Sequence, residues 1–218
     1  MDLGAFNRGM AARLGRNGHP LRHHLIGVAR LSARLAVRAG CDPAVARAAG
    51  YLHDWARPLP ARRLSLALRR YRVRLDPGAR AIPELWHGPV AAEMARREHG
   101  ISHPGVLRAV RIHTTGCPRA STAELCLIVA DFCEPGRRFR EARVARRLAR
   151  RNLKLAANYV ASSRIAYLKE AGIVPHPSAV AFLSGLAASP TKSANAKLCL
   201  AASPAKSANA NSRLARRN

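Results

Sequence analysis

Apolar residues recur every three or four positions along most of the chain, which is the spacing of one buried helix face. Between residues 21 and 39 these positions are Leu21, Leu25, Val28, Leu31 and Leu35. Gly40 ends this first helix, and Asp42-Pro43 supplies an N-cap and a proline for the first turn of the next. The second helix is predicted to run to Arg57, with His53 and Asp54 near its C-terminus, before Pro58 and Pro60 stop it.

The same periodicity predicts helices over the rest of the patterned region. Their expected ranges are 64–73, about 83–99, 104–113, 124–132, 141–171 and 177–186. Asp76-Pro77-Gly78 is predicted to be a turn. The apolar run 124–132 fits a buried helix or a strand by periodicity alone, but its Ala, Leu and Cys content favours a helix. We therefore expect an all-α fold, a helical bundle.

The two ends of the chain differ from this middle part. Residues 1–17 are weakly patterned and are expected to form a leader, either frayed or a short helix, ahead of one folded domain over residues 18–187. From 188 onward the sequence has little apolar bulk, and AASPTKSANA at 187–196 recurs as AASPAKSANA at 201–210. Such low complexity predicts a disordered tail over 188–218.

Charge and cysteine content limit the possible partners and compartments. The chain has 38 Lys and Arg against 12 Asp and Glu, a formal charge of +26. Such an excess attracts polyanions such as nucleotides or nucleic acid. An Arg-rich composition without a binding role is nevertheless the preferred explanation. No apolar run reaches the roughly 18 residues of a membrane span. An odd number of cysteines, no CxxC pair and no secretory leader indicate a reducing, cytoplasmic location.

Six possible metal ligands fall near predicted helix ends or inner faces. They are His24, His53, Asp54, His87, His113 and Asp131. One structural zinc takes four ligands, so this larger set suits two ions that share a bridging carboxylate, for which Asp54 is the natural choice. A water between two such ions becomes a hydroxide near neutral pH and can attack phosphorus. The histidines favour iron or manganese over calcium or magnesium.

The remaining histidines are assigned by their phase with the buried stripes. His24 is preferred over His23 because it lies four residues before Val28, on the inner face. His19, His99 and His103 fall at expected loops or helix boundaries and are predicted to face solvent.

The order His24, His53-Asp54 and Asp131 resembles the HD superfamily of metal-dependent phosphohydrolases, and the inserted His87 and His113 resemble its two-metal branch. The segments LWHGPV (85–90), RIHTTG (111–116) and VADFCEPGR (129–137) are similar to its YqeK-type group, the symmetrical bis(5′-nucleosyl)-tetraphosphatases. The resemblance covers residues 18 to 187. It implies an HD-domain helical bundle that hydrolyses diadenosine tetraphosphate to two ADP, with bound iron.

The resemblance also implies roles for single residues. His24, His53, Asp54 and Asp131 would hold one ion, and Asp54, His87 and His113 the other. Arg57, Thr114 and Arg137 are candidates for binding the polyphosphate of the dinucleoside substrate, because arginine forks match phosphate oxygens.

Three positions depart from the group's pattern. Leu21 and Cys117 stand where the group usually has Arg, although Arg119 is close enough to substitute for the second, and Arg57 stands where the group has Lys. Two alternatives therefore stay open: an HD hydrolase acting on another nucleotide or phosphoester, and a non-enzymatic helical protein that binds nucleic acid. The oligomeric state is not predicted.

Overall fold

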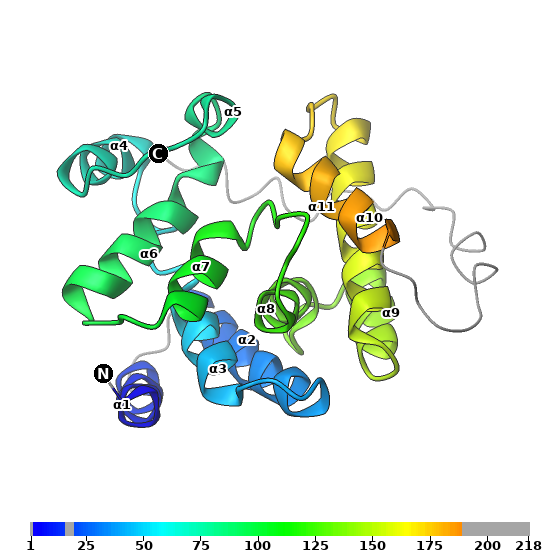
Figure 1. Cartoon of the computed structure of the whole chain (residues 1–218), viewed down its shortest axis with the longest axis horizontal. Helices are drawn as coiled ribbons and strands as arrows, with labels where there is room; N and C mark the ends of the chain where they lie inside the picture. The colour runs from blue at the N-terminus through cyan, green and yellow to red at the C-terminus, as the bar shows by residue number, and fades with distance from the viewer. Residues whose placement is uncertain (1, 16–19, 189–218) are drawn as a thin grey trace.

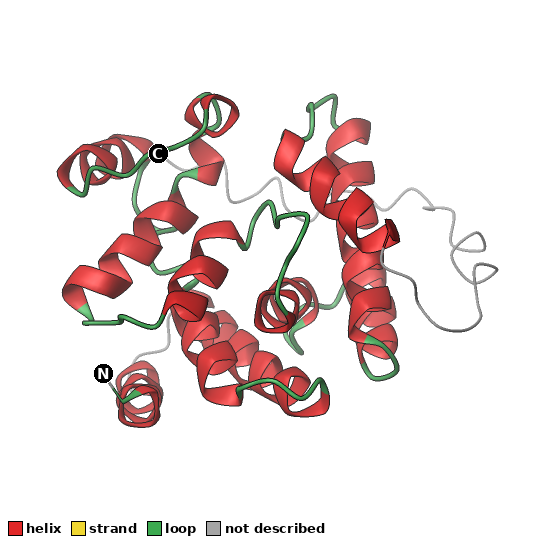
Figure 2. Ribbon diagram, viewed as in Figure 1, coloured by secondary structure: helices red, strands yellow, loops and turns green. Residues whose placement is uncertain are grey.

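The computed structural model describes residues 2–15 and 20–188, and the regular structure in those ranges is entirely helical (Figure 2). This confirms the all-α prediction. The elements are α1 Leu3–Gly15, α2 Pro20–Arg38, α3 Pro43–Leu52, α4 Ala61–Arg70, α5 Pro77–Arg80, the 3₁₀ turn η1 Pro83–Leu85, α6 His87–Glu98, α7 Pro104–Ile112, α8 Thr122–Cys133, α9 Arg140–Ala149, α10 Leu153–Glu170 and α11 Pro177–Ala188. The tail predicted over 188–218 lies outside the described residues, apart from Ala188.

Helix α8 is the centre of the bundle and is seen end-on in the middle of Figure 1. Nearly all of its residues are buried, and it packs against α2, α3, α7, α9 and α10. Ser121 and Glu124 form a reciprocal capping box at its start, which satisfies two backbone N–H groups of the first turn. The strand alternative for this apolar run is therefore wrong. Because α8 is enclosed on several sides, Asp131 near its end is held inside the protein.

Helix α3 ends at Leu52 and not at Arg57 as predicted. The His53 N–H makes the last helical bond, to the Ala49 carbonyl, and the chain then passes through tight turns. The N–H groups of Trp55, Arg57 and Leu59 bond to the carbonyl three residues back and not four, so the helical ladder stops well before Pro58. His53 and Asp54 therefore lie in a turn after the helix, where neighbouring side chains are free to face different ways.

The single helix predicted over 141–171 is also wrong, because the chain breaks between α9 and α10. Residues 150–152 form a turn, and the Asn152 side chain accepts a hydrogen bond from the Leu155 N–H at 2.9 Å. An Asn N-cap favours the start of a new helix over continuation of the old one. The break lets α10 fold back along α9, so that both helices pack against α8.

Most of the expected leader is a helix. Helix α1 packs against α3, and its Met10 and Leu14 are buried in a small apolar cluster with Leu25 and Tyr51. How the chain divides into domains stays a prediction.

His99 does not face solvent as predicted. Its ring packs edge-on against Trp55 and Phe6, with centroid separations of 5.2 and 6.2 Å. His103 is exposed, as expected, and caps α7. His19 lies outside the described residues.

Two segments distant in sequence meet beside the bundle. Asp76 caps the one-turn helix α5, and its carboxylate also accepts a hydrogen bond from His176, just before α11, at 3.0 Å. Within the described ranges none of the helices has both the length and the apolar character needed to cross a bilayer. The four cysteines described there are free thiols.

The break between α9 and α10 can be tested by removing the cap. Asn152→Ala leaves an N–H of the first turn of α10 without its side-chain acceptor, which costs about 1 kcal/mol of unfolding free energy. Urea denaturation of the full chain should measure that loss. Lys154→Ala, an exposed change in the same turn, should stay within about 0.5 kcal/mol of the wild type. Equal stabilities for the two variants would contradict the cap.

Candidate metal centre

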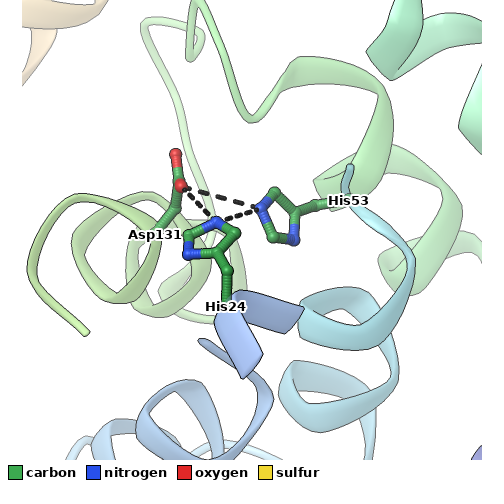
Figure 3. Close-up of side chains that lie close together, drawn as sticks. All are labelled: His24, His53 and Asp131. Carbon is green, nitrogen blue, oxygen red and sulfur yellow. Dashed lines mark hydrogen bonds and ion pairs between the residues drawn. The ribbon is translucent and has the colours of Figure 1, made fainter. Parts of the chain in front are cut away.

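Three side chains from distant parts of the chain form the first half of the centre (Figure 3). His24 comes from α2, His53 from the turn after α3, and Asp131 from α8. The His24 Nε2 lies 3.3 Å from the His53 Nε2 and 3.2 Å from the Asp131 Oδ1, and the His53 Nε2 lies 3.6 Å from that oxygen. Figure 3 shows the two rings and the carboxylate pointing at one another.

Asp54, His87 and His113 form the second half. The Asp54 Oδ1 lies 3.2 Å from the His87 Nε2 and 3.4 Å from the His113 Nε2, and the two imidazole nitrogens are 3.1 Å apart. The other Asp54 oxygen, Oδ2, faces the first half, 3.7 Å from the His53 Nε2 and 3.9 Å from the His24 Nε2. One carboxylate therefore presents one oxygen to each half.

The protein backbone fixes the orientation of three of the rings. The Nδ1 of His53 donates to the Gly50 carbonyl at 2.9 Å, and the Nδ1 groups of His87 and His113 each donate to the carbonyl three residues earlier at 2.8 Å. The Nδ1 of His24 lies 3.4 Å from the Glu134 carboxylate. Protons at Nδ1 leave the Nε2 lone pairs directed into the centre, which is the usual arrangement around metal-binding histidines.

These lone pairs face one another and carboxylate oxygens, an arrangement that a bound cation would stabilise. The Asp54 Oδ1 is buried and has no hydrogen-bond donor in the described structure. Two ligand atoms at the usual 2.0–2.2 Å from an ion lie roughly 2.8–3.6 Å apart when the angle at the ion is about 90–110°. The separations within each half, 3.1–3.6 Å, match this range closely. The donor set therefore fits two divalent ions.

The electrostatics of the centre keep its carboxylates ionised. Burial opposes the charged form of Asp54, but His53 and the facing His113 and His87 rings hold its pKa well below the ordinary range. The pKa of Asp131 is also held low, against burial, by His24, His53 and Arg164.

Neighbouring carboxylates stabilise the protonated form of His24. Burial lowers the pKa of His24, but the hydrogen bonds with Asp131 and Glu134 outweigh it and raise the pKa to about 9. A proton on His24 therefore balances part of the negative charge of these carboxylates.

The predicted substrate residues lie around the centre. Arg57 and Thr114 line a pocket of about 550 Å³ that opens beside it. The Arg57 Nη1 donates to the Asp54 Oδ2 at 2.9 Å, and the Arg137 Nη2 lies 3.6 Å from the Asp131 Oδ1. All six predicted ligands and the three predicted substrate residues are thus brought together, while their roles stay predictions.

Two further residues were not identified from the sequence. Arg164 of α10 donates to the Asp131 Oδ2 at 2.7 Å, and the buried Glu134 contacts His24 and accepts from the Gly136 N–H at 2.6 Å. A charged residue in the apolar stripe that includes Val160 and Ala161 was the available signal for Arg164. The scarcity of acids in this chain was the signal for Glu134.

Two of the three departures from the family pattern, Leu21 and Cys117, lie outside this pocket, whereas Arg57 lines it. The Cys117 Sγ accepts a hydrogen bond from the Arg108 guanidinium, and Arg119 is exposed. Neither residue lines the pocket, so Arg119 does not replace the missing arginine there. Gly116, with a φ of +68°, packs against the Phe182 ring of α11, and the preceding Thr114 and Thr115 line the pocket.

Comparisons with known proteins identify relatives of this chain. The model of the HD domain matches residues 21–161. The symmetrical bis(5′-nucleosyl)-tetraphosphatase of Bacillus subtilis is 35% identical over 136 residues, 61% of this chain and 71% of that protein, and the protein of the same name from Halalkalibacterium halodurans is 35% identical over 136 residues, 61% and 72% of the two chains.

A solved structure is similar over most of its length. The crystal structure of an HD superfamily hydrolase from Clostridium acetobutylicum, described as involved in NAD metabolism, superposes with a TM-score of 0.77 and 27% identity. The match covers 84% of this chain and 96% of that one.

The raised pKa of His24 predicts that ion binding releases a proton. Below pH 9 the His24 Nε2 is mostly protonated in the metal-free protein, so an ion must displace that proton, and binding weakens as the pH falls. Calorimetric titration with Mn²⁺ at pH 7.5, in buffers of different ionisation enthalpy, should show release of about one proton at this residue.

Two variants separate this histidine from its neighbour. His24→Gln should lose the proton release, whereas His23→Gln, an exposed change one position away, should keep it. A wild type that binds Mn²⁺ without releasing a proton would contradict the assignment.

Proposed function

This chain belongs to the HD-domain family and is an HD-domain phosphohydrolase, and we propose that it hydrolyses diadenosine tetraphosphate symmetrically to two ADP. The observation that carries the proposal is the pair of ligand groups that face the two oxygens of Asp54, beside a pocket lined in part by Arg57 and Arg164. The named relatives from two bacteria supply the substrate class.

We propose that His24, His53, Asp54 and Asp131 hold one divalent ion, and that Asp54, His87 and His113 hold the second. Four imidazoles favour iron or manganese over ions that prefer oxygen ligands. When bound, such ions stabilise negative charge on phosphoryl oxygens and lower the pKa of water. In this proposal Asp54 faces both ligand groups with one carboxylate. It would thereby fix their spacing and their position relative to the phosphorus atom that reacts.

The guanidinium groups of Arg57 and Arg137 are proposed to bind the polyphosphate of the substrate. Arg57 and Arg137 now contact the Asp54 Oδ2 and the Asp131 Oδ1, the oxygens that face the first half. Cations at those oxygens would remove the electrostatic reason for these contacts, which leaves both arginines able to bind phosphate. Thr114 adds a hydroxyl at the same wall. Charge-assisted bonds from arginine forks orient a phosphate as well as attract it.

The apolar walls of the pocket are proposed to bind one nucleoside of the substrate. The apolar residues that line the pocket include Leu64, Leu85, Ile165, Leu168 and Phe182. About 550 Å³ is within the range of small-ligand pockets and suits one half of a dinucleotide. If one nucleoside and its two phosphates occupy the space between wall and centre, the central P–O–P linkage falls at the centre. Water then adds across that linkage, and each product keeps two phosphates.

The alternatives differ in how they fit this site. A non-enzymatic role does not fit a chain of this hydrolase family, but nucleic-acid binding by the basic surface stays a prediction, as does the cytoplasmic location. Another nucleotide remains the second candidate substrate, because Leu21 and Cys117 differ from the group and the Clostridium relative is described through NAD metabolism.

The proposed reaction is tested by its products. Metal-stripped protein, reloaded with Mn²⁺ or with Fe²⁺ under reducing conditions, should convert diadenosine tetraphosphate to ADP alone on anion-exchange chromatography. ATP plus AMP would contradict symmetrical cleavage. No turnover of this substrate, with turnover of another nucleotide in a panel, would support the second candidate.

Paired variants test the role of the centre in that assay. Asp54→Asn should lower kcat by more than the roughly 10- to 100-fold that losing an outer partner of a metal ligand costs. Asp42→Asn makes the same chemical change at an exposed N-cap, where Asn is an equally good cap. It should leave turnover unchanged, and equal loss in both variants would contradict a special role for Asp54.

A further inference from the structure

Arg164 is the one guanidinium in the described structure that contacts both halves of the centre. Its Nη2 donates to the Asp131 Oδ2 at 2.7 Å, and its Nη1 donates to the His113 carbonyl at 3.2 Å. The guanidinium also lies 5.8 Å from the centroid of the Phe132 ring. The side chain is 28% exposed, so it reaches from α10 into the protein with three contacts that limit its motion.

The oxygen that Arg164 contacts distinguishes it from the other arginines. The Asp131 Oδ1 faces His24 and His53, whereas Oδ2 faces Arg164. Arg57 and Arg137 instead contact oxygens that face the ligand groups. An ion in the first half would therefore compete with those two arginines but not with Arg164. The Arg164 contact can persist while Asp131 binds an ion through its other oxygen.

The second contact reaches the other half of the centre. His113 is the last residue before the loop 114–120, and its ring is already held by the bond from Nδ1 to the Val110 carbonyl. Arg164 holds the carbonyl of the same residue. One side chain on α10 thus ties the end of α7 to the end of α8.

We propose that Arg164 is a positioning residue that braces the two metal-binding halves against each other. It keeps Asp131 presenting a single oxygen and fixes the backbone from which the His113 ring projects. The inference rests on the metal binding of the proposed function and adds a residue that acts through the ligands without itself binding an ion. Such outer contacts commonly change metal affinity 10- to 100-fold.

The charge of Arg164 and its contacts predict opposite changes in ion affinity when the side chain is removed. A guanidinium close to a divalent cation repels it, so deleting that charge should tighten ion binding if charge were its only effect. A brace predicts weaker binding after the same deletion. Lysine separates the two further, because it keeps the charge but lacks the planar fork that reaches two acceptors in fixed geometry.

The test measures Mn²⁺ affinity of the full, metal-stripped chain by calorimetry, without substrate. Arg164→Ala should weaken binding by roughly 10- to 100-fold, and Arg164→Lys should weaken it by a smaller factor. Arg143→Ala removes the same charge from an exposed position on α9 and should leave the affinity within about twofold of the wild type. Thermal unfolding of each metal-free variant shows whether it is folded.

The measured affinities decide whether Arg164 positions the ligands or acts through its charge alone. Wild-type affinity in Arg164→Lys, or equal or tighter binding in Arg164→Ala, would overturn the brace and leave an arginine that acts by charge. If Arg164→Ala fails to fold, the Lys variant decides alone. If the wild type itself binds no Mn²⁺, the proposed function fails, which is a separate result from failure of the brace.

Discussion

The structure depends on one unfavourable interaction: imidazole lone pairs and carboxylate oxygens, which repel one another, lie close together inside the protein. The Nε2 atoms of His87 and His113 lie 3.1 Å apart, and no residue of the described ranges donates a hydrogen bond to the Asp54 Oδ1 that faces them. Buried polar atoms without partners cost free energy, so a fold keeps them where a function requires them. A pair of divalent ions removes this repulsion, because every facing atom is then a ligand.

Helix ends provide the means of holding this arrangement. His53, His87 and His113 each lie at the beginning or end of a helix or in the turn beside it, and each bonds through Nδ1 to a carbonyl three residues back. These contacts are local, so the orientation of each ring is set by its own turn of chain. Packing around α8 then brings the oriented rings to Asp131. Glu134 and Arg164 act at the next distance outward, on His24 and on Asp131.

The parts that could be predicted from the sequence are those with a local chemical signature. His24 could be separated from the exposed His23 by its phase with Val28, and Asp54 by its scarcity as an acid beside a histidine. The end of α3 could not be placed, because the residues up to Arg57 are compatible with a helix and no capping residue marks the end at Leu52. The break at Asn152 was missed because helical residues flank it on both sides, and only one side chain marks the cap. Arg164 was missed because its partners, Asp131 and the His113 carbonyl, are distant in sequence.

The central claim is that the facing lone pairs exist to bind two cations that share Asp54. Anomalous diffraction from crystals grown with Mn²⁺ tests it most directly, since it locates each ion independently of turnover. The account predicts two peaks about 3.5–4 Å apart, one against His24, His53 and Asp131 and the other against His87 and His113, with the Asp54 carboxylate between them. A single peak, or ions bound away from Asp54, would contradict it.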